Sequence, residues 1–428
     1  MNNWTQRDKT AIWHPFTPLE AMEAPLVIDK AEGVNLYTPE GKRIIDVISS
    51  WWVNIHGHSN SYLAEAIASQ ARQLEHVIFA GFTHKPAITL AERLLEILPD
   101  NQDKVFYSDN GSTAVEVGIK MAFQYFYNKG ISKKRIIAID GAYHGDTFGA
   151  MSVGERGPFT EPFDPYLFSV DFLDFPEKEK EQQVWKHFKE LVETDEVAAF
   201  IFEPIVQGAS GMRVYAAELL DRMIALAQAN DVICIADEVM TGFGRLGTLF
   251  AADQLSHKPD IFCLSKGLTG GALAMGVTTC TDKIQSAYRS SDLMKTFFHG
   301  HSFTANPMTC AVANASLDLL LSEECDANRQ RLNERHIAFM TKLEAHSMVR
   351  NPRVMGTILA FELNTERDTS YFNEARHHLY PYFIEKGLLI RPLGNVIYLI
   401  PPYIISDEDL DYTYSTMLSF LDEYNDLF

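Results

Sequence analysis

The chain has 428 residues, of which 46% are hydrophobic and 22% are charged. This composition is typical of a globular protein and excludes a disordered or collagen-like chain, while the length favours two domains. The 57 acidic and 37 basic residues give a formal net charge of −20. A surface of that sign repels nucleic-acid phosphates and anionic membranes, so we expect small-molecule partners and neither nucleic acid nor a membrane.

The sequence carries no signal for a membrane span, a secretion route or a metal site. No apolar run reaches the ~18 residues that a span requires, and the N-terminus lacks the layout of a secretion signal. The five cysteines are widely spaced and show no zinc-ligand spacing. We therefore expect a cytoplasmic location, no metal, and buried free thiols. The cysteines are Cys234, Cys263, Cys280, Cys310 and Cys325.

The predicted elements change in character along the chain. Near the N-terminus, Val34–Tyr37 and Arg43–Asp46 read as a hairpin around the turn 38–42. From about residue 60 to 310, short apolar strands alternate with amphipathic helices. The predicted strands are 105–107, 135–139, 197–202, 232–236 and 260–264, and the predicted helices are 113–127, 182–193 and 217–229. After them, a long helix over Cys310–Leu321 begins a stretch of mixed helices and short strands.

This order of elements predicts an α/β fold with a mostly parallel central sheet covered by helices, and a smaller α+β domain. The large domain is expected to span residues 56–310. The small domain is expected to combine the N-terminal segment 1–55 with the C-terminal part 311–428. In open sheets of this kind ligands bind beyond the carboxyl ends of the strands, so residues that follow predicted strands are candidates for a site.

Four clusters of glycine and polar residues follow predicted strands. They span residues 108–113, 140–146, 235–239 and 265–271. Taken singly, each has an ordinary structural explanation: a helix cap, a turn around a partly buried tyrosine, a solvated strand end and a surface lysine. Their common position at strand ends makes a shared site the stronger interpretation.

The four clusters together contain the groups that pyridoxal phosphate requires. This cofactor needs an amine that binds its aldehyde, a carboxylate that keeps its ring nitrogen protonated, a phosphate cradle and an aromatic plate. Lys266, Asp237, the run 111–113 and Tyr143 are of these four kinds. A helix that begins with Gly-Ser-Thr offers backbone N–H groups and hydroxyls to a phosphate. We therefore predict pyridoxal 5'-phosphate as the cofactor.

The strings DEVMTGFGR (237–245) and LSKGLTGG (264–271) resemble the fold-type I, class III pyridoxal-phosphate aminotransferases. Five further strings are similar to the branch of that family that acts in biotin biosynthesis. They are WHPFT (13–17), SSWW (49–52), GAYHGDT (141–147), EPIVQGASGM (203–212) and RPLGNVIYLIPPY (391–403). The resemblance runs from about residue 10 to 405. It implies a ping-pong transfer of an amino group from S-adenosylmethionine to 8-amino-7-oxononanoate, giving 7,8-diaminononanoate.

The resemblance also implies roles for the residues at the strand ends. Lys266 would hold the cofactor and, once free, move a proton, a task that suits a lysine of depressed pKa. Asp237 would pair with the ring nitrogen and Tyr143 would stack on the ring. Gly111 and Ser112 would bind the phosphate.

In this family two subunits share each active site, which implies a homodimer. The residues implied to reach the partner's phosphate are His301 and Ser302, and Gly300 would lie beside the substrate in the same loop. The alternative for this histidine-containing loop is a plain turn.

For the substrates, the resemblance implies contacts from Trp51, Trp52, Tyr143 and Arg391. A guanidinium can hold the carboxylate of 8-amino-7-oxononanoate through two parallel hydrogen bonds. Tryptophan faces suit an aliphatic chain and a sulfonium cation. The alternatives are core packing for the tryptophans and a local ion pair for the arginine. Further residues implied to line or support the site are Phe16, Asp146, Arg245 and Lys266.

The amino donor is the open point. Met240 stands where relatives that act on ornithine or γ-aminobutyrate usually have glutamine, which favours the biotin branch. Phe16 stands where enzymes that use adenosylmethionine often have tyrosine, so lysine is an alternative donor. An ω-amino-acid:pyruvate or diamine aminotransferase is the alternative within the fold. A nucleotide-binding protein is disfavoured because no GxGxxG follows a first strand and no GxxxxGK[ST] occurs anywhere. A pyridoxal-phosphate-binding regulator is disfavoured because no DNA-binding module is apparent.

Overall fold

The computed structural model describes residues 3–20, 24–365 and 369–425. Its centre is a seven-stranded sheet with the order β4-β12-β11-β10-β7-β5-β6. The strands are β4 (Gln102–Ser108), β12 (Gly276–Thr281), β11 (Ile261–Leu264), β10 (Ile233–Asp237), β7 (Val197–Phe202), β5 (Arg135–Ile139) and β6 (Asp171–Leu173). Only β12 runs against the others within this sheet, so the predicted mostly parallel sheet is confirmed.

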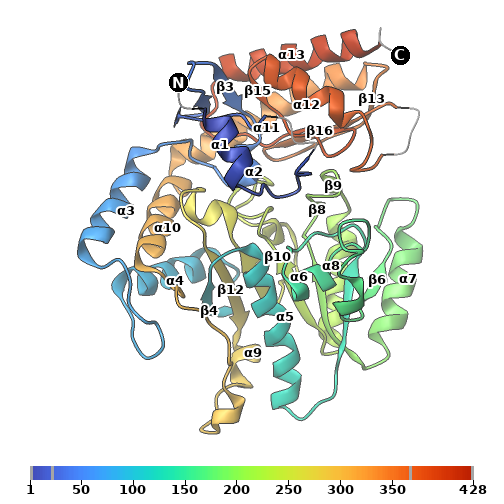
Figure 1. The fold of residues 1–428 in the computed structure, drawn as a ribbon. Coiled ribbons are helices and arrows are strands. Elements are labelled where there is room, and N and C mark those ends of the chain that lie inside the picture. Colours follow the sequence, from blue (N-terminus) through green and yellow to red (C-terminus); the bar gives the residue numbers. More distant parts are fainter. Residues whose placement is uncertain (1–2, 21–23, 366–368, 426–428) are drawn as a thin grey trace.

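Helices cover both faces of this sheet (Figure 1). The helix α5 (Gly111–Asn128) packs on one face, and α7 (Glu181–Val192) and α8 (Ala217–Ala229) lie on the other. Strand β7 shows why both faces need cover, because its six residues are all buried. Its Ile201 belongs to the core beside α5, whereas Phe200 and Phe202 belong to the core beside α8. This alternation of faces follows from the period of two residues in a strand.

Both ends of the chain contribute to the upper part of Figure 1. The N-terminal strands β1 (Lys30–Glu32), β2 (Asn35–Tyr37) and β3 (Arg43–Asp46) form an antiparallel run, and β15 (Leu388–Leu389) pairs with β3 in parallel. Another antiparallel sheet contains β13 (Val349–Met355), β14 (Ile358–Leu363) and β16 (Val396–Leu399). The remaining helices there are α1 (Trp4–Ala11), α2 (Ser49–Trp52), α11 (Glu323–Glu344), α12 (Arg376–Glu385) and α13 (Asp407–Asn425).

The other elements surround the central sheet. They are α3 (Ser61–Gln73), α4 (Lys85–Ile97), α6 (Phe148–Ser152), α9 (Asp282–Ser286), α10 (Pro307–Leu320) and the hairpin β8 (Val206–Gln207) and β9 (Arg213–Val214). The short 3-10 helices are η1 (Asp164–Tyr166), η2 (Ala251–Gln254), η3 (Lys266–Thr269) and η4 (Leu293–Lys295). The predicted helix over 310–321 is thus confirmed as α10, with its start three residues earlier. The domain boundaries at 55/56 and 310/311 stay predictions.

Two strands of the central sheet, β12 and β6, were absent from the sequence prediction. Strand β12 has the sequence GVTTCT, in which three threonines interrupt the apolar pattern. Two of these threonines satisfy their hydroxyls inside the protein. Thr278 donates to the carbonyl of Ala114 at 2.7 Å, and Thr279 donates to the side-chain oxygen of Gln102 at 2.7 Å. Tertiary hydrogen bonds therefore make this threonine-rich segment suitable for a buried strand between β4 and β11.

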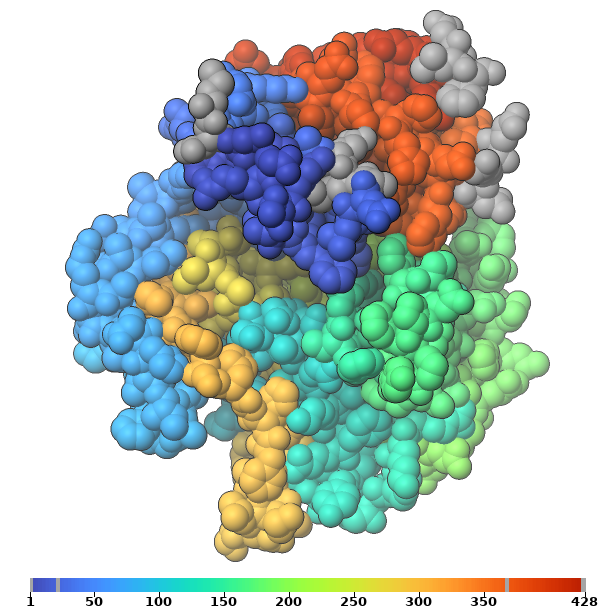
Figure 2. Space-filling model, in the orientation of Figure 1, coloured from blue at the N-terminus to red at the C-terminus, as the bar shows by residue number. Residues whose placement is uncertain are grey.

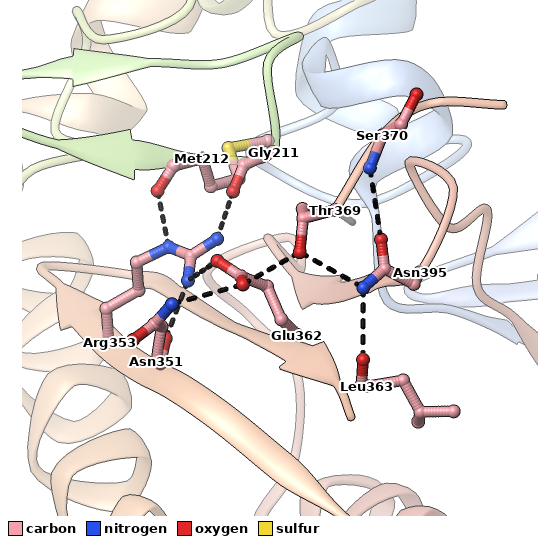
Figure 3. Close-up of polar contacts among 9 residues, drawn as sticks. All are labelled: Gly211, Met212, Asn351, Arg353, Glu362, Leu363, Thr369, Ser370 and Asn395. Carbon is pink, nitrogen blue, oxygen red and sulfur yellow. Dashed lines mark hydrogen bonds and ion pairs between the residues drawn. The ribbon is translucent and has the colours of Figure 1, made fainter. Parts of the chain in front are cut away.

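Hydrogen bonds from one arginine join the C-terminal sheet to the hairpin loop between β8 and β9 (Figure 3). Arg353 on β13 lies 3.3 Å from the carboxylate of Glu362 on β14. Its guanidinium also donates to the carbonyl of Met212 at 2.8 Å and to the carbonyl of Gly211. These bonds connect the C-terminal sheet to the segment 203–212, which reaches the candidate site described below.

Two predictions about composition can be compared with the structure. All five cysteines are buried and free, as predicted. Burial raises the pKa of Cys234 and Cys263 far above the ordinary thiol value, so both stay protonated and unreactive. Among the helices that the structure describes, none has the length and apolar character needed to cross a membrane.

Candidate active site

A cavity of about 620 Å³ opens at the carboxyl ends of the central strands, where the sequence analysis placed the site. Five different strands or their following loops contribute to it. The residues that line it are Trp52, Val53, Asn110, Gly111, Ser112, Tyr143, His144, Gly145, Asp146, Thr147, Glu203, Asp237, Val239, Met240, Ser265, Lys266, Gly271, Leu273, Ala274 and Met275. Gly111, Ser112, Tyr143, Asp146, Asp237, Lys266 and Trp52 had all been predicted as site residues.

Lys266 follows β11 and begins η3, with a positive φ of 42°. Its amine lies 4.8 Å from the centre of the Trp52 ring. In the described part of the chain no carboxylate lies within ion-pair distance of this amine. Burial lowers the pKa of Lys266, and the nearby charge of Arg245 lowers it further, although Asp237 and Glu203 act in the opposite direction. A lowered pKa makes the neutral form of the amine, which is the nucleophile, easier to reach. The role of Lys266 toward the cofactor stays a prediction.

Asp237 ends β10 with its carboxylate buried at the cavity. Its Oδ2 lies 2.6 Å from Nδ1 of His144, and its Oδ1 accepts the backbone N–H of Val239 at 3.0 Å. Because a carboxylate can only accept, His144 carries a proton on Nδ1. The other ring nitrogen of His144 is buried and has no hydrogen-bond partner among the described residues. The histidine thus orients a carboxylate that lines the cavity.

A second buried acid lies beside this pair. Glu203 accepts the backbone N–H of Tyr143 at 3.1 Å and that of Gly208 at 2.9 Å. Burial raises the pKa of Glu203 to about 7, and Asp237 contributes to the rise, while His144 opposes it. This acid therefore exchanges its proton near neutral pH, in contrast to an exposed glutamate.

Tyr143 stands at the wall of the cavity and keeps part of its surface exposed. Its hydroxyl donates to Asp146 at 3.1 Å, and burial raises its pKa, so the hydroxyl remains protonated. The backbone of Asp146 donates in turn to the hydroxyl of Ser112 at 3.2 Å. Gly145 allows this contact, because a Cβ on it would lie 1.9 Å from that hydroxyl oxygen.

The start of α5 supplies backbone donors to the cavity. The side chain of Asn110 caps the helix by accepting the N–H of Thr113 at 2.9 Å. The N–H groups at Gly111 and Ser112 remain available in the first turn, where the helix dipole favours an anion. A Cβ on Gly111 would approach Val239 to 2.8 Å, so glycine permits the close packing of this helix start on the β10 loop.

Three residues predicted to bind substrate contact one another but are not among the residues that line the cavity. The Phe16 and Trp51 rings lie 5.7 Å apart, and the guanidinium of Arg391 lies 5.1 Å from the centre of the Trp51 ring. Phe16 and Trp51 are exposed, in contrast to Trp52. In Figure 2 the dark-blue N-terminal segment lies between the orange-red C-terminal part and the green middle part of the chain.

The structure does not place the guanidinium of Arg245 in the cavity. Its side chain is buried and donates to the carbonyl of Trp52 at 3.2 Å and to the carbonyl of Pro401 at 3.1 Å. It also lies 5.0 Å from the ring of Tyr403. This arginine binds protein backbone, so it can support the site through the Trp52 segment, and a direct contact with substrate stays a prediction.

Gly300, His301 and Ser302 do not line this cavity either. His301 donates its backbone N–H to Thr304 at 3.1 Å, and its Nδ1 accepts the N–H of Phe303 at 3.2 Å. Its Nε2 is buried without a partner in the described chain. The role expected for these residues requires a second subunit and stays a prediction.

Two cavity residues, His144 and Glu203, were missed by the sequence prediction. A signal existed for Glu203, because it directly follows the apolar strand 197–202, as Asp237 follows its own strand. His144 lies in the cluster 140–146 that follows a predicted strand, but no local signal indicated its pairing with Asp237, which lies 93 positions along the chain. Only the pairing of strands brings these two side chains together.

Comparison with known proteins agrees with this geometry. Residues 17–421 match the family described as Aminotransferase class-III. The chain belongs to the class III aminotransferases. One relative, the adenosylmethionine-8-amino-7-oxononanoate aminotransferase of Synechococcus elongatus, is 47% identical over 96% of this chain and 98% of its own length. The enzyme of the same name from Geobacter sulfurreducens is 40% identical over 95% of this chain and 94% of its own.

Solved structures give the same result for this class III aminotransferase. The adenosylmethionine-8-amino-7-oxononanoate aminotransferase of Methanocaldococcus jannaschii superimposes with a TM-score of 0.93 at 34% identity and covers 98% of both chains. An amine transaminase from an uncultivated Pseudomonas species, solved in a PLP-bound form, gives 0.90 at 28% identity, with 96% of this chain and 98% of its own covered. The predicted fold-type I architecture is confirmed.

Class III aminotransferases depend on pyridoxal phosphate, and the residues present fit this cofactor. A buried amine of lowered pKa, Lys266, suits an aldehyde. Asp237, oriented by His144, suits a protonated ring nitrogen. The first turn of α5 suits a phosphate, and Tyr143 suits a ring face. The cofactor predicted from the sequence is therefore confirmed at the level of the family.

Proposed function

We propose that this class III aminotransferase transfers an amino group from S-adenosylmethionine to 8-amino-7-oxononanoate, giving 7,8-diaminononanoate for biotin biosynthesis. The observation that carries the proposal is the 47% identity, over nearly the whole of both chains, with the Synechococcus elongatus aminotransferase of that name. A ping-pong sequence follows, in which the donor leaves before the acceptor binds.

The residues of the cavity would divide the chemistry as follows. When bound, pyridoxal phosphate supplies an aldehyde that combines with amines and a ring that accepts electrons from the substrate carbon. Lys266 would bind that aldehyde and, once released, accept and return the proton of the substrate carbon. Asp237 would keep the ring nitrogen protonated, because a carboxylate held by His144 favours a positive charge beside it. Tyr143 would stack on the ring.

The substrate would extend from this cavity toward the exposed aromatic residues. Arg391 carries a positive charge beside the Trp51 ring, so it can bind the carboxylate end of 8-amino-7-oxononanoate. Trp52 lines the cavity and offers an apolar face to the aliphatic chain. Phe16 lies against Trp51, at the position where a tyrosine hydroxyl would favour adenosylmethionine as donor.

The half-reactions test this function. The purified holoenzyme, mixed with S-adenosylmethionine alone, should lose the visible absorbance of its bound aldehyde and regain it when 8-amino-7-oxononanoate is added. L-Lysine in place of the donor, and pyruvate in place of the acceptor, are the matched alternatives. A response to lysine alone would replace the proposed donor, and a response to pyruvate alone would replace the proposed acceptor.

We also propose a homodimer in which His301 and Ser302 of each subunit bind the phosphate in the other. The proposal is supported by their position outside the cavity of their own chain and by the exposed Phe298 and Phe303 in the same segment. Mixed dimers provide the test. Lys266→Ala and His301→Ala subunits, each inactive alone, should regain activity after they are mixed and refolded together, because one of the two sites then has both residues. No regain would contradict shared sites.

A cytoplasmic location is proposed as well. It is supported by the five buried, free cysteines, which are typical of a reducing compartment. Fractionation of cells that express the chain without added signals should recover the aminotransferase activity with the cytoplasmic marker enzymes. Recovery with the membranes or the medium would contradict it.

A further inference from the structure

The turn Ser49–Trp52 has a backbone conformation that L-amino acids disfavour. Its four residues have φ angles of 53°, 45°, 72° and 73° in chain order, and ψ is 54° at Ser50 and 46° at Trp51. These angles describe one turn of left-handed helix, in which each Cβ crowds the following carbonyl. Residues other than glycine visit this region singly, and four in succession persist only where surrounding contacts impose the conformation.

A buried carboxylate supplies the contacts at the start of the turn. Asp46, the last residue of β3, is completely buried. Its Oδ1 accepts the N–H of Ile48 at 3.1 Å, and its Oδ2 accepts the hydroxyl of Ser50 at 2.7 Å. The same Oδ2 lies 2.9 Å from Nε2 of His58. Two groups of the turn region and one ring from the following loop therefore meet on one side chain.

Contacts from distant segments hold the rest of the turn. The hydroxyl of Ser49 donates to the carbonyl of Ile400 at 2.7 Å. The buried guanidinium of Arg245 donates to the carbonyl of Trp52 at 3.2 Å. Because these partners are themselves buried, the turn is bonded at both of its ends to the protein interior.

The turn places two consecutive tryptophans in two different parts of the site. The Trp52 ring lies 4.8 Å from the amine of Lys266, and its indole N–H donates to the hydroxyl of Tyr398 at 3.1 Å. The Trp51 ring is exposed and lies 5.1 Å from the guanidinium of Arg391. Any rearrangement of the four backbone residues would move both rings together.

We propose that Asp46 is a positioning residue of the active site. With His58 it holds the turn Ser49–Trp52 in its left-handed conformation, and through the turn it sets the place of both tryptophan rings. Its effect on Lys266 is indirect: the Trp52 ring excludes water from the amine, which keeps the lysine pKa low. This inference deepens the proposed function, and only its kinetic measurements rest on that function.

His58 offers the sharpest test because its side chain is 15% exposed and borders a second cavity of about 200 Å³. His58→Leu removes the donor to Asp46, whereas His58→Gln keeps an N–H on a side chain of similar reach. In the holoenzyme, His58→Leu should raise the pH midpoint of the visible absorbance change, because water then reaches Lys266. It should also lower kcat/KM for donor and acceptor at least about tenfold, mainly through KM. His58→Gln should restore both values.

Asp46→Ala should act in the same direction as His58→Leu and more strongly. Asp260→Asn is the control for loss of a buried carboxylate: Asp260 precedes β11 at the edge of the sheet away from the cavity and accepts the N–H of Cys234 at 2.9 Å. This control should lower thermal stability without changing the absorbance midpoint. An unchanged midpoint and unchanged KM in a folded His58→Leu variant would overturn the proposal. The midpoint requires no substrate, so it decides even if the proposed substrates are wrong.

Discussion

Asp237 and Lys266 lie at the ends of two neighbouring strands, whereas Phe16, Trp51 and Arg391 come from opposite ends of the chain and meet through their side chains. We call the first region, with His144 and Glu203, the floor of the site, and the second region its entrance. The floor is buried and each acid in it accepts two hydrogen bonds. In the entrance Phe16 and Trp51 are exposed and Arg391 is half-buried, and the three residues are held together by contacts to the Trp51 ring.

This contrast separates two functions. Groups that move protons need lowered or raised pKa values, which only burial and directed hydrogen bonds provide. Groups that choose a substrate need surface and adaptability, which exposed aromatic side chains provide. Substitutions in the floor should therefore change whether the reaction occurs, and substitutions in the entrance should change which molecule reacts.

The largest effect is expected for Lys266→Ala. The variant loses the amine that binds the aldehyde and moves the proton, so amino transfer should fall by at least about 1000-fold. Stopped-flow absorbance with donor alone measures the loss. Lys258→Ala, which removes an amine bonded to the carbonyl of Ala252 outside the cavity, should keep normal rates. A rate within tenfold of wild type in Lys266→Ala would contradict the role of the floor.

Glu203→Gln tests the floor through stability. The pKa of Glu203 is about 7 in the folded protein, compared with 4.5 for a glutamate in the unfolded chain. Between these values the folded state binds more protons, so this group's contribution to the free energy of unfolding falls as pH rises from 4.5 to 7. The Glu203→Gln variant has no such group to titrate. As the pH rises from 4.5 to 8, its free energy of unfolding should therefore increase by up to about 3 kcal/mol relative to that of the wild type.

Urea unfolding of both proteins, with the cofactor removed, at pH 5 and pH 8 measures this change. Glu196→Gln is the control, because Glu196 is an exposed glutamate that precedes β7, at the opposite end of this strand from Glu203. It should show the same stability difference from wild type at both pH values. An equal difference at both pH values for Glu203→Gln would show that the acid is not held protonated.

Arg391→Ala tests the entrance. Loss of a charge-assisted hydrogen-bond pair costs about 1.5–3 kcal/mol, so KM for 8-amino-7-oxononanoate should rise roughly 10- to 100-fold with little change in kcat. Steady-state kinetics at saturating donor measure both. Arg376→Ala removes a guanidinium 5.2 Å from the Tyr371 ring and serves as the control. If KM for the acceptor stayed unchanged, the carboxylate would be bound elsewhere.

The smallest effect is expected for Phe16→Tyr. An added hydroxyl that bonds one donor should contribute about 1 kcal/mol, so the ratio of kcat/KM for S-adenosylmethionine to that for lysine should rise roughly fivefold. Competition between the two donors measures this ratio. Phe372→Tyr is the control. Phe372 contacts Phe159, which in turn contacts Phe16, so the same hydroxyl is added farther from the site and should leave the ratio unchanged. A fall in the ratio would show that the phenylalanine at position 16, and not a tyrosine, favours S-adenosylmethionine as the donor.

Much of the floor could be predicted because its residues carry a local pattern. Asp237 and Lys266 each follow a short apolar strand, and in a parallel sheet such positions share one edge. Glu203 satisfies the same rule and could have been found with it. The enclosure of the Arg245 guanidinium by backbone carbonyls could not be predicted, because sequence position does not show which groups surround a side chain.

Local periodicity and residue type were enough to predict the alternation of strands and helices, the end of the sheet at which the site lies and the chemical groups available there. The tertiary structure alone decided the pairing of His144 with Asp237, the antiparallel place of β12 and the left-handed turn at Ser49–Trp52. Each of these depends on hydrogen bonds between residues far apart in the chain, whose free energy exists only once the sheet has brought them together.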